Sequence, residues 1–291
     1  EAALLAGLPN SPERFRPDRH PEAARGRRDL VLDRMLNARM IDETQHRHAV
    51  MSPIVLQNER ETENRRHAGW MALRSAGRGR AVETTIDPTA QSILERIVAD
   101  HAAMLPRDLD IAVVLVETAT GEVRGLIGSS DPLDPRDGQV NGTTARRSPG
   151  SALKPFIYAA AFEAGRLAPD SIVDDVPIDI SGWRPRNIDR GHRGPMPAGE
   201  ALQTSRNVPA ILITRDLGLD TVEATLRRSG LPLPIGALSA AGLTAAVGGV
   251  EVRAIDLAEA YATLARGGIH RSVRLLRGAP SPTRRVFSES T

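Results

Sequence analysis

The chain has 291 residues, which is enough for one large domain or two ordinary ones, and 41% of them are hydrophobic. Its 38 basic and 36 acidic residues leave a formal net charge of +2, and aromatic residues make up only 3%. Without a basic excess or aromatic stacking platforms, nucleic-acid binding is not indicated. The absence of cysteine excludes a disulfide framework, a thiolate nucleophile and a cysteine metal site.

Targeting and membrane signals are missing from the sequence. No apolar run approaches the roughly 18 to 20 residues of a membrane-spanning helix. The first residues, Glu1-Ala2-Ala3-Leu4-Leu5, lack the form of a signal peptide and read as the middle of a helix. We therefore expect any targeting segment or membrane anchor to lie upstream of Glu1.

Residues 1–66 are highly charged and carry the signals of a helical region. Residues 8–12, which include two prolines, end one predicted helix, and Pro21 opens the next at a favoured first-turn position. Asp42, followed three residues later by Gln45, predicts a capping box for another short helix. The pattern alone predicts a fragment of a helical bundle.

A domain boundary is predicted after residue 66. Residues 75–80, Ser-Ala-Gly-Arg-Gly-Arg, have the composition of a linker. We therefore assign residues 67–82 to a linker and residues 83–291 to a second domain.

The second domain begins with helix and hairpin signals and continues mainly as helices. Asp87-Pro88 opens an amphipathic helix that runs to about Ala103. Residues 111–117 and 122–129 are rich in β-formers and are joined by a turn, which predicts an antiparallel hairpin. This order predicts an α+β fold. Further helices are predicted over residues 152–164, 208–217, 221–229 and 254–266.

The chemistry-bearing candidates begin with Ser151 and Lys154, a Ser-x-x-Lys pattern where a loop turns into a helix. Positions three apart share a helical face, so the two side chains are predicted to meet directly. The positive end of a helix favours developing negative charge near the serine and lowers the pKa of a nearby lysine. Pro155 predicts a tightened or kinked first turn. The plainer interpretation is a capping serine and a surface lysine.

A count favours the functional interpretation. Lys154 is the only lysine among the 38 basic residues, and all the others are arginine. Arginine cannot lose its proton at useful pH, whereas lysine can act as a general base. The one position that is lysine is therefore predicted to be the one that must release a proton.

A second candidate motif, Ser205-Arg206-Asn207, precedes another predicted helix. Taken alone, Ser205 or Asn207 is as well explained as a helix cap. Ser-x-x-Lys, Ser-Asp-Asn and Lys-Thr-Gly together are the signature of class A β-lactamases and penicillin-binding proteins. The motif here keeps the hydroxyl and the amide of Ser-Asp-Asn.

Three segments together resemble the transpeptidase domain of class A penicillin-binding proteins, and most of all their 1C type. Residues 1–35 resemble the end of the glycosyltransferase domain of the same family, so the resemblance covers nearly the whole chain. The three segments are residues 147–158, residues 205–210, and residues 248–251 with 260–262.

The resemblance implies a role for each site residue. Ser151 would attack the D-Ala-D-Ala amide of a peptidoglycan stem peptide to form an acyl-enzyme, and Lys154 would take its proton. Ser205 would relay a proton to the leaving D-Ala, and Asn207 would hold the substrate's amide backbone. An amine of a neighbouring stem would then receive the acyl group, which cross-links two glycan strands. The oxyanion hole would combine the Ser151 N–H with one from a later strand.

The resemblance also implies partners and a location. Expected partners are stem peptides, the lipid-linked precursor, β-lactam antibiotics and other cell-wall synthesis proteins, with no cofactor, metal or nucleic acid. A bacterial inner-membrane anchor would hold the catalytic domains in the periplasm. The Lys-Thr-Gly motif is absent from the chain and is expected after Thr291, and this chain by itself is expected to be inactive. No glycosyltransferase catalytic residue is assigned.

Three alternatives remain at this stage. A non-catalytic family member would use the same cleft to hold wall peptides or antibiotics without turnover. A serine β-lactamase would need an activated water, but the chain lacks the Glu-x-x-Leu-Asn pattern of such enzymes. A metal hydrolase is disfavoured because the seven histidines form no ligand pattern.

Overall fold

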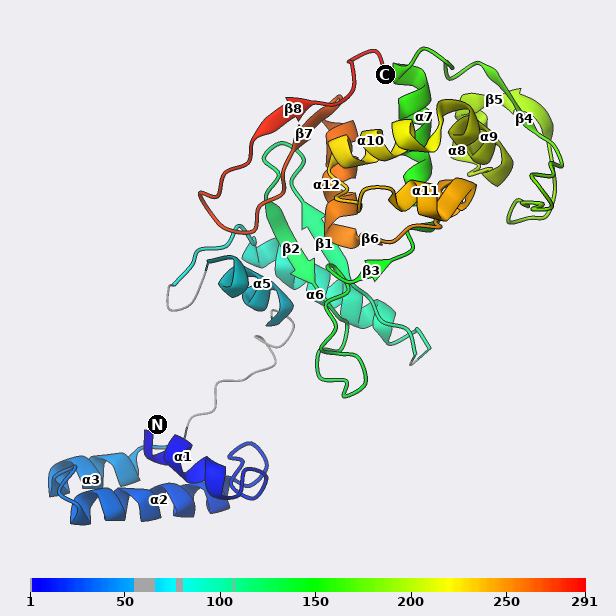
Figure 1. The fold of residues 1–291 in the computed structure, drawn as a ribbon. Helices are drawn as coiled ribbons and strands as arrows, with labels where there is room; N and C mark the ends of the chain where they lie inside the picture. The colour runs from blue at the N-terminus through cyan, green and yellow to red at the C-terminus, as the bar shows by residue number, and fades with distance from the viewer. Residues whose placement is uncertain (1, 55–65, 77–80, 107) are drawn as a thin grey trace. The chain divides into compact units, whose positions relative to one another are not determined.

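The computed structural model describes residues 2–54, 66–76, 81–106 and 108–291. The chain divides into two compact units, Glu1–Thr62 and Glu63–Thr291, and Figure 1 shows the elements of each. Within the described residues, no helix combines the length and apolarity needed to cross a membrane. The first unit contains α1 (Ala2–Gly7), the 3₁₀ helix η1 (Leu8–Asn10), α2 (Pro21–Asn37) and α3 (Glu43–Met51).

The first unit follows its helix signals closely. Pro21 begins α2, as predicted. The predicted capping box of α3 is confirmed, because Asp42 Oδ1 accepts the Gln45 N–H at 2.7 Å and Gln45 Oε1 accepts the Asp42 N–H at 3.0 Å. Buried Arg28 joins the two helices by donating to the Ser52 carbonyl at 2.7 Å and the Val50 carbonyl at 2.9 Å. A guanidinium thus satisfies carbonyls at the end of α3.

The second unit opens with two helices and a hairpin, followed by a mainly helical half. Its strands pair only in twos among the described residues: β1 with β2, β3 with β6, β4 with β5 and β7 with β8, all antiparallel. The elements are α5 (Arg66–Ala76), α6 (Pro88–Ala102), β1 (Val113–Val116), β2 (Val123–Ile127), β3 (Arg146–Arg147), η2 (Gly150–Leu153), α7 (Lys154–Glu163), β4 (Ile172–Asp175), β5 (Gly194–Pro197), α8 (Ala198–Gln203), α9 (Asn207–Leu217), α10 (Leu219–Ser229), α11 (Ala237–Ala241), η3 (Gly242–Val247), β6 (Val252–Arg253), α12 (Ala254–Ala265), β7 (Ile269–Arg271) and β8 (Thr283–Arg285).

The hairpin and the helix beside it confirm the sequence prediction. Asp87 caps α6 by accepting the Ala90 N–H at 2.8 Å. Buried Gln91 of α6 both donates to the Leu126 carbonyl at 3.1 Å and accepts the Leu126 N–H at 2.8 Å. A side-chain amide therefore hydrogen-bonds one backbone position of β2 as a neighbouring strand would.

Part of the predicted linker of residues 67–82 is helical in the structure. Ten of its residues continue helix α5, whose Ala68 and Ala72 are buried in an apolar cluster with Val123 and Leu126 of β2. The linker was inferred from residues 75–80, of which 77–80 lie outside the described residues. A helix face of small residues gives a weak apolar signal, so the contact with β2 decides the outcome.

The helical half is built around α7, which is almost entirely buried. Side chains from Phe156 to Ala161 are buried, and α9 and α10 pack against this helix, as Figure 1 shows. The largest apolar cluster combines residues of α7, α9 and α10 with Leu231, Leu238 and Val252. This packing fixes the start of α7, where the predicted serine and lysine lie.

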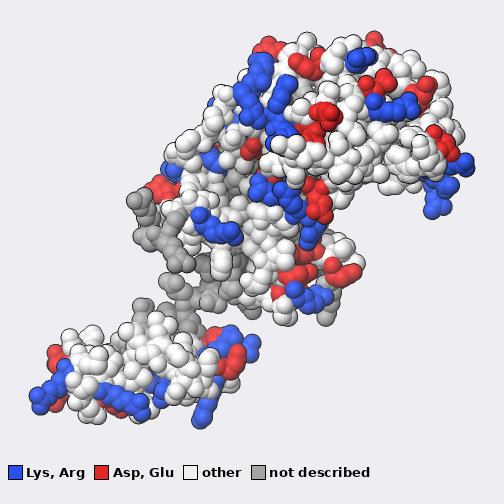
Figure 2. Space-filling view, in the orientation of Figure 1, with Lys and Arg blue, Asp and Glu red and all other residues white. Residues whose placement is uncertain are grey.

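Charges of both signs are interspersed on the face of the second unit that Figure 2 shows. Figure 2 shows basic and acidic side chains side by side on the visible face, with wide uncharged areas between them. This agrees with a formal net charge of only +2.

Candidate active site

The Ser-x-x-Lys segment lies where a 3₁₀ turn joins a helix. Residues Gly150–Leu153 form η2, and α7 follows directly from Lys154 with Pro155 in its first turn. The tightened first turn predicted from Pro155 is confirmed. Ser151 is exposed, whereas the Lys154 side chain belongs to the core, with only 1% of its surface exposed. An exposed serine thus lies three residues before a buried lysine.

Three oxygen atoms surround the Lys154 ammonium. Its Nζ lies 2.6 Å from the Ser205 carbonyl oxygen, 2.7 Å from Asn207 Oδ1 and 3.2 Å from Ser205 Oγ. An ammonium has three N–H donors, so these contacts satisfy all of them. The fold therefore brings the two sequence-predicted motifs into direct contact.

The environment of Lys154 makes it easier to deprotonate. Burial is the main cause and the positive charge of Arg206 the second, and together they lower the pKa of Lys154 from 10.5 to about 8. A lysine with a pKa near neutral pH is suited to general-base work. The direction was predicted from the sequence, but the cause was expected to be the helix start.

The predicted direct contact between Ser151 and Lys154 is not present. Among the hydrogen bonds of the described residues, none joins these two side chains; all the acceptors of Lys154 belong to Ser205 and Asn207. A protonated lysine has no lone pair with which to accept the serine proton. Transfer of the Ser151 proton to Lys154 would therefore require the deprotonated amine.

The capping interpretation of Ser205 and Asn207 is wrong. The N-terminus of α9 has no side-chain cap from its own flanking residue. Instead Asn187, from the connection between β4 and β5, accepts the Asn207 N–H at 2.7 Å and the Val208 N–H at 3.4 Å. Because this distant amide caps the helix, Ser205 and the Asn207 side chain are left to face Lys154.

The two amide atoms of Asn207 have different partners. Its Oδ1 accepts from Lys154, while its Nδ2 donates to the Arg186 carbonyl at 2.8 Å. Ser205 has a left-handed backbone with φ +54°, which is uncommon for a residue with a side chain. This conformation presents both the carbonyl and the hydroxyl of Ser205 to the same ammonium.

The loop before Ser151 is held by a close backbone approach. Ser148 Oγ donates to the Gly248 carbonyl at 2.7 Å, and a Cβ on Gly248 would lie 2.6 Å from Gly150 Cα. With φ +100°, Gly248 also has a backbone that only glycine adopts readily. Tyr261 donates to the Ala152 carbonyl at 2.9 Å from the other side. Contacts on two sides thus fix the turn that carries Ser151.

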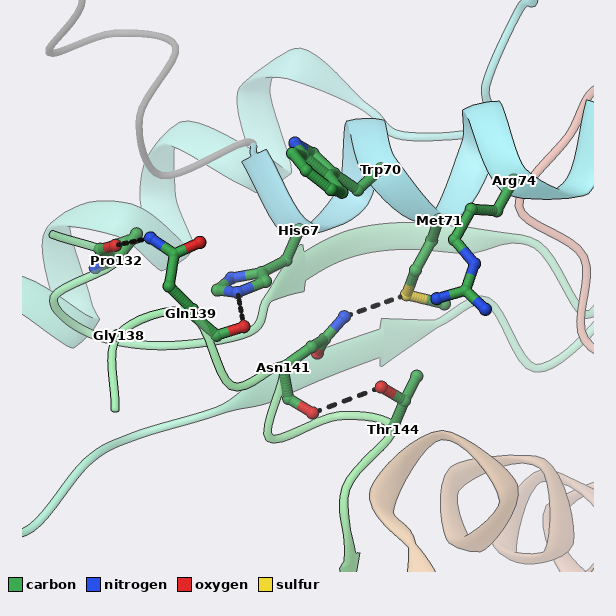
Figure 3. A pocket seen from close by; sticks show the side chains of 9 residues that line it. All are labelled: His67, Trp70, Met71, Arg74, Pro132, Gly138, Gln139, Asn141 and Thr144. Carbon is green, nitrogen blue, oxygen red and sulfur yellow. Dashed lines mark hydrogen bonds between the residues drawn. The ribbon is translucent and has the colours of Figure 1, made fainter. Parts of the chain in front are cut away.

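A separate cavity lies elsewhere in the second unit. It has a volume of about 330 Å³ and is lined by residues of α5 and of the segment 132–144, as Figure 3 shows. Trp70 and Arg74 of α5 face it together with His67. The described residues that line it include none of the four predicted site residues. Nor do the described His, Asp and Glu residues form a group that could hold a metal ion.

Sequence reasoning missed the residues that support the site. Within the Ser205–Asn207 segment, Arg206 donates to Asp175 and Asp189, and the Asn207 N–H donates to Asn187. Nothing in the local sequence of these three partners indicates such contacts. They were placed in a region for which no element was predicted. Only the pairing of β4 with β5 brings them to α9.

The fold is that of the transpeptidase domain of penicillin-binding proteins. Residues 111–291 match the family described as penicillin binding protein transpeptidase domain, and the chain belongs to this family. Its relatives are class A penicillin-binding proteins. Penicillin-binding protein 1C of Escherichia coli (strain K12) is 35% identical over 289 residues, which cover 99% of this chain and 37% of that protein.

Further comparisons agree with this assignment. Penicillin-binding protein 1B of Vibrio cholerae is 30% identical over 319 residues, covering 100% of this chain and 39% of that protein. The structure of PonA1 from Mycobacterium tuberculosis in complex with penicillin V has a TM-score of 0.63 and 25% identity, over 79% of this chain and 66% of that one. Penicillin-binding protein 1A from Haemophilus influenzae shares the fold with a TM-score of 0.63, at 20% identity, over 97% of this chain and 57% of that chain. The chain spans well under half the length of these two curated relatives.

Proposed function

We propose that this chain carries a serine-type D,D-transpeptidase site in which Ser151 is the nucleophile and Lys154 its general base. The observation that supports it best is the environment of the only lysine, which is buried, bound by three oxygens and lowered in pKa to about 8. Burying a cation is costly, so a core lysine with a near-neutral pKa is better explained by proton transfer than by stability.

The reaction begins with deprotonated Lys154. Its Nζ takes the proton of the Ser151 hydroxyl as Oγ bonds to the carbonyl carbon of the penultimate D-Ala. The bond to the leaving D-Ala then breaks, and Ser205 passes a proton from Lys154 to the departing amine. Ser205 Oγ lies 3.2 Å from Lys154 Nζ, within reach for this relay. The amine of a second stem peptide then attacks the ester carbonyl, the bond to Ser151 Oγ breaks, and the proton lost by the amine returns to Oγ. The new amide is the cross-link.

Two groups would stabilise the substrate. Asn207 would bind the backbone amide of the stem peptide with its side-chain amide, after exchanging one of its present partners. The Ser151 N–H, at the start of the helical segment, would bind the oxyanion together with an N–H from a later strand. A β-lactam would acylate Ser151 by the same first step.

For the whole protein, we propose a bifunctional cell-wall enzyme. Residues 1–66 would be the end of a glycosyltransferase domain, residues 67–82 the connection and residues 83–291 the transpeptidase domain. A membrane anchor outside this chain would hold both domains in the periplasm, where the lipid-linked precursor and stem peptides are found. Cell-wall synthesis proteins would be its partners.

Acylation by a labelled penicillin tests the proposal. The full-length gene product should form one covalent adduct, located at Ser151 by peptide mapping, and Ser151→Ala should remove it. Ser92→Ala, an exposed serine of α6, is the matched control and should label normally. Reversible binding without any adduct would instead identify a non-catalytic family member, and an adduct on another residue would overturn the assignment of Ser151.

A further inference from the structure

Arg206, the middle residue of the Ser205–Asn207 segment, is a buried cation with a partner for each arm of its guanidinium. Only 3% of its side chain is exposed. Nε donates to Asp175 Oδ2 at 2.7 Å, Nη1 to Asp189 Oδ2 at 2.7 Å and Nη2 to the Gly191 carbonyl at 2.6 Å. Charge-assisted contacts of this kind are both strong and directional. Arg206 therefore has a single well-defined position.

All three partners belong to one stretch of chain, the end of β4 and the loop of residues 176–193. The same loop caps α9 through Asn187 and accepts the Asn207 side chain through the Arg186 carbonyl. Arg206 lies in sequence between Ser205 and Asn207, the two residues whose oxygens face Lys154. The loop thus contacts the Ser205–Asn207 turn through both the Arg206 guanidinium and the backbone and side chain of Asn207.

The geometry of the turn depends on this anchor. Ser205 has the left-handed φ of +54°, a sparsely populated conformation for serine that persists only where surrounding contacts impose it. We propose that Arg206 is a positioning residue, which locks the loop of residues 176–193 against the Ser205–Asn207 turn and so presents their oxygens to Lys154. Its importance for the reaction rests on the proposed function.

The charge of Arg206 has a second effect on Lys154. It disfavours the ammonium and contributes to the lowered pKa of Lys154, after burial. Asp175 and Asp189 offset part of this charge. The other ionisable groups are spread over α7 itself and the elements packed on it, of which η2 and η3 have none. They are Tyr158 and Glu163 on α7, Glu200 on α8, Arg215 and Asp216 at the far end of α9, and Asp220, Glu223, Arg227 and Arg228 on α10; His192 lies outside these elements, beside Asp175.

Two substitutions should therefore move Lys154 in opposite directions. Arg206→Gln removes a nearby positive charge, so the pKa of Lys154 should rise. Asp189→Asn keeps the shape of a 48% exposed side chain but leaves Arg206 less neutralised, so the pKa of Lys154 should fall. A purely structural role for Arg206 would not produce shifts of opposite sign.

The single lysine makes the measurement direct. In the 291-residue chain labelled with ¹³Cε-lysine, one NMR resonance reports Lys154, with an expected midpoint of about pH 8. The midpoint should rise in Arg206→Gln and fall in Asp189→Asn. His192→Gln tests the one imidazole beside Asp175, and Arg184→Gln, an exposed pair with Asp179 in the same loop, is the matched control; neither should move the midpoint more than a small fraction of the other shifts.

Acylation provides the second readout. In the full-length gene product, Arg206→Gln should lower the acylation rate at pH 7 by about tenfold and move the acid limb of the pH–rate profile upward. If Arg206→Gln does not fold, Asp189→Asn provides the test: the acid limb of its pH–rate profile should lie at lower pH than in the wild type. An unchanged Lys154 midpoint, or shifts of the same sign in both variants, would overturn the inference. A wild type that forms no adduct would overturn the proposed function and leave the lysine titration as an independent test of Arg206.

Discussion

At the scale of single residues, Lys154 is unusual because its charge lies in the core. A buried ammonium persists only where hydrogen bonds satisfy it, and here two residues supply all three acceptors. The balance at Lys154 is set by burial first and by the positive charge of Arg206 second, which both disfavour the ammonium and lower its pKa. The same balance makes both its reactivity and its effect on stability depend on pH.

Replacing Lys154 by arginine separates charge from proton transfer. Lys154→Arg retains the positive charge but cannot act as a base, so acylation by a labelled penicillin should fall by about 10²-fold or more. The rate is measured by stopped-time labelling of the full-length gene product, with circular dichroism to verify folding. A variant that retains more than about a tenth of the rate would contradict the base role.

Lys154 should also make the stability of the protein depend on pH. Its pKa is 10.5 when unfolded and about 8 when folded, so between these values the unfolded chain binds the extra proton. The contribution of Lys154 to the free energy of unfolding therefore rises with pH between about pH 8 and 10.5, and it is constant below and above this range. Relative to Lys154→Met, the wild-type free energy of unfolding should gain about 3 kcal/mol from pH 8 to 10.5. Urea titrations at several pH values measure it, and a difference without any slope would contradict the lowered pKa.

At the scale of elements, α9 depends on a residue that is distant in sequence. Asn187 caps this helix, whereas Asn207 points its side chain at Lys154 and the Arg186 carbonyl. Asn187→Ala should thus lower the free energy of unfolding by about 1 to 2 kcal/mol. Asn207→Ser leaves the cap in place, so it should depress acylation with the smaller loss of stability. Thermal melts and labelling rates measure both, and equal losses in the two variants would remove the distinction.

Long, strongly patterned elements could be predicted from the sequence. The start of α2 at Pro21, the capping box of α3, α6 and the β1–β2 hairpin are all confirmed, because local signals decide them. Strand β5, Gly-Pro-Met-Pro, and the two-residue β3 carry no periodic signal and exist only through their partners. Tertiary contacts also decide α5, which the linker composition concealed.

The residues of the candidate site also fall into two groups, those that the sequence predicts and those that only the structure reveals. The sequence predicted four site residues, because their types and spacing match the motifs of a known family: Ser151, Lys154, Ser205 and Asn207. Their catalytic roles stay predictions. The supporting residues Asp175, Asn187 and Asp189 could not be found, since a hydrogen bond across a loop leaves no periodic mark in the sequence. The prediction that Ser151 and Lys154 are in direct contact was wrong, because the hydrogen-bond partners of the Lys154 amine come from another part of the chain.

At the scale of the whole molecule, the two units differ sharply in how much apolar surface they bury. The three apolar clusters of the described chain are drawn entirely from residues 68–287. Among the described residues of the first unit, the buried apolar side chains are Ala3, Ala24 and Leu32, together with the buried guanidinium of Arg28. Small units with so little core are marginal, because burial must offset the conformational entropy of ordering the chain.

This asymmetry predicts that the second unit determines the unfolding transition. Removing the first unit should change the free energy of unfolding of the second by less than about 1 kcal/mol. Because 1 kcal/mol shifts the melting temperature of a domain of this size by roughly 2 to 4 °C, a chain of residues 63–291 should unfold within about 2 °C of the 291-residue chain. A peptide of residues 1–54 should be only partly helical by circular dichroism, since isolated helices of this length are marginal in water. Arg28→Ala, which removes the contacts with the Val50 and Ser52 carbonyls, should lower that helicity further and leave the main transition of the 291-residue chain unchanged. A fall of more than about 5 °C on removing residues 1–62 would mean that the core of the second unit needs the first.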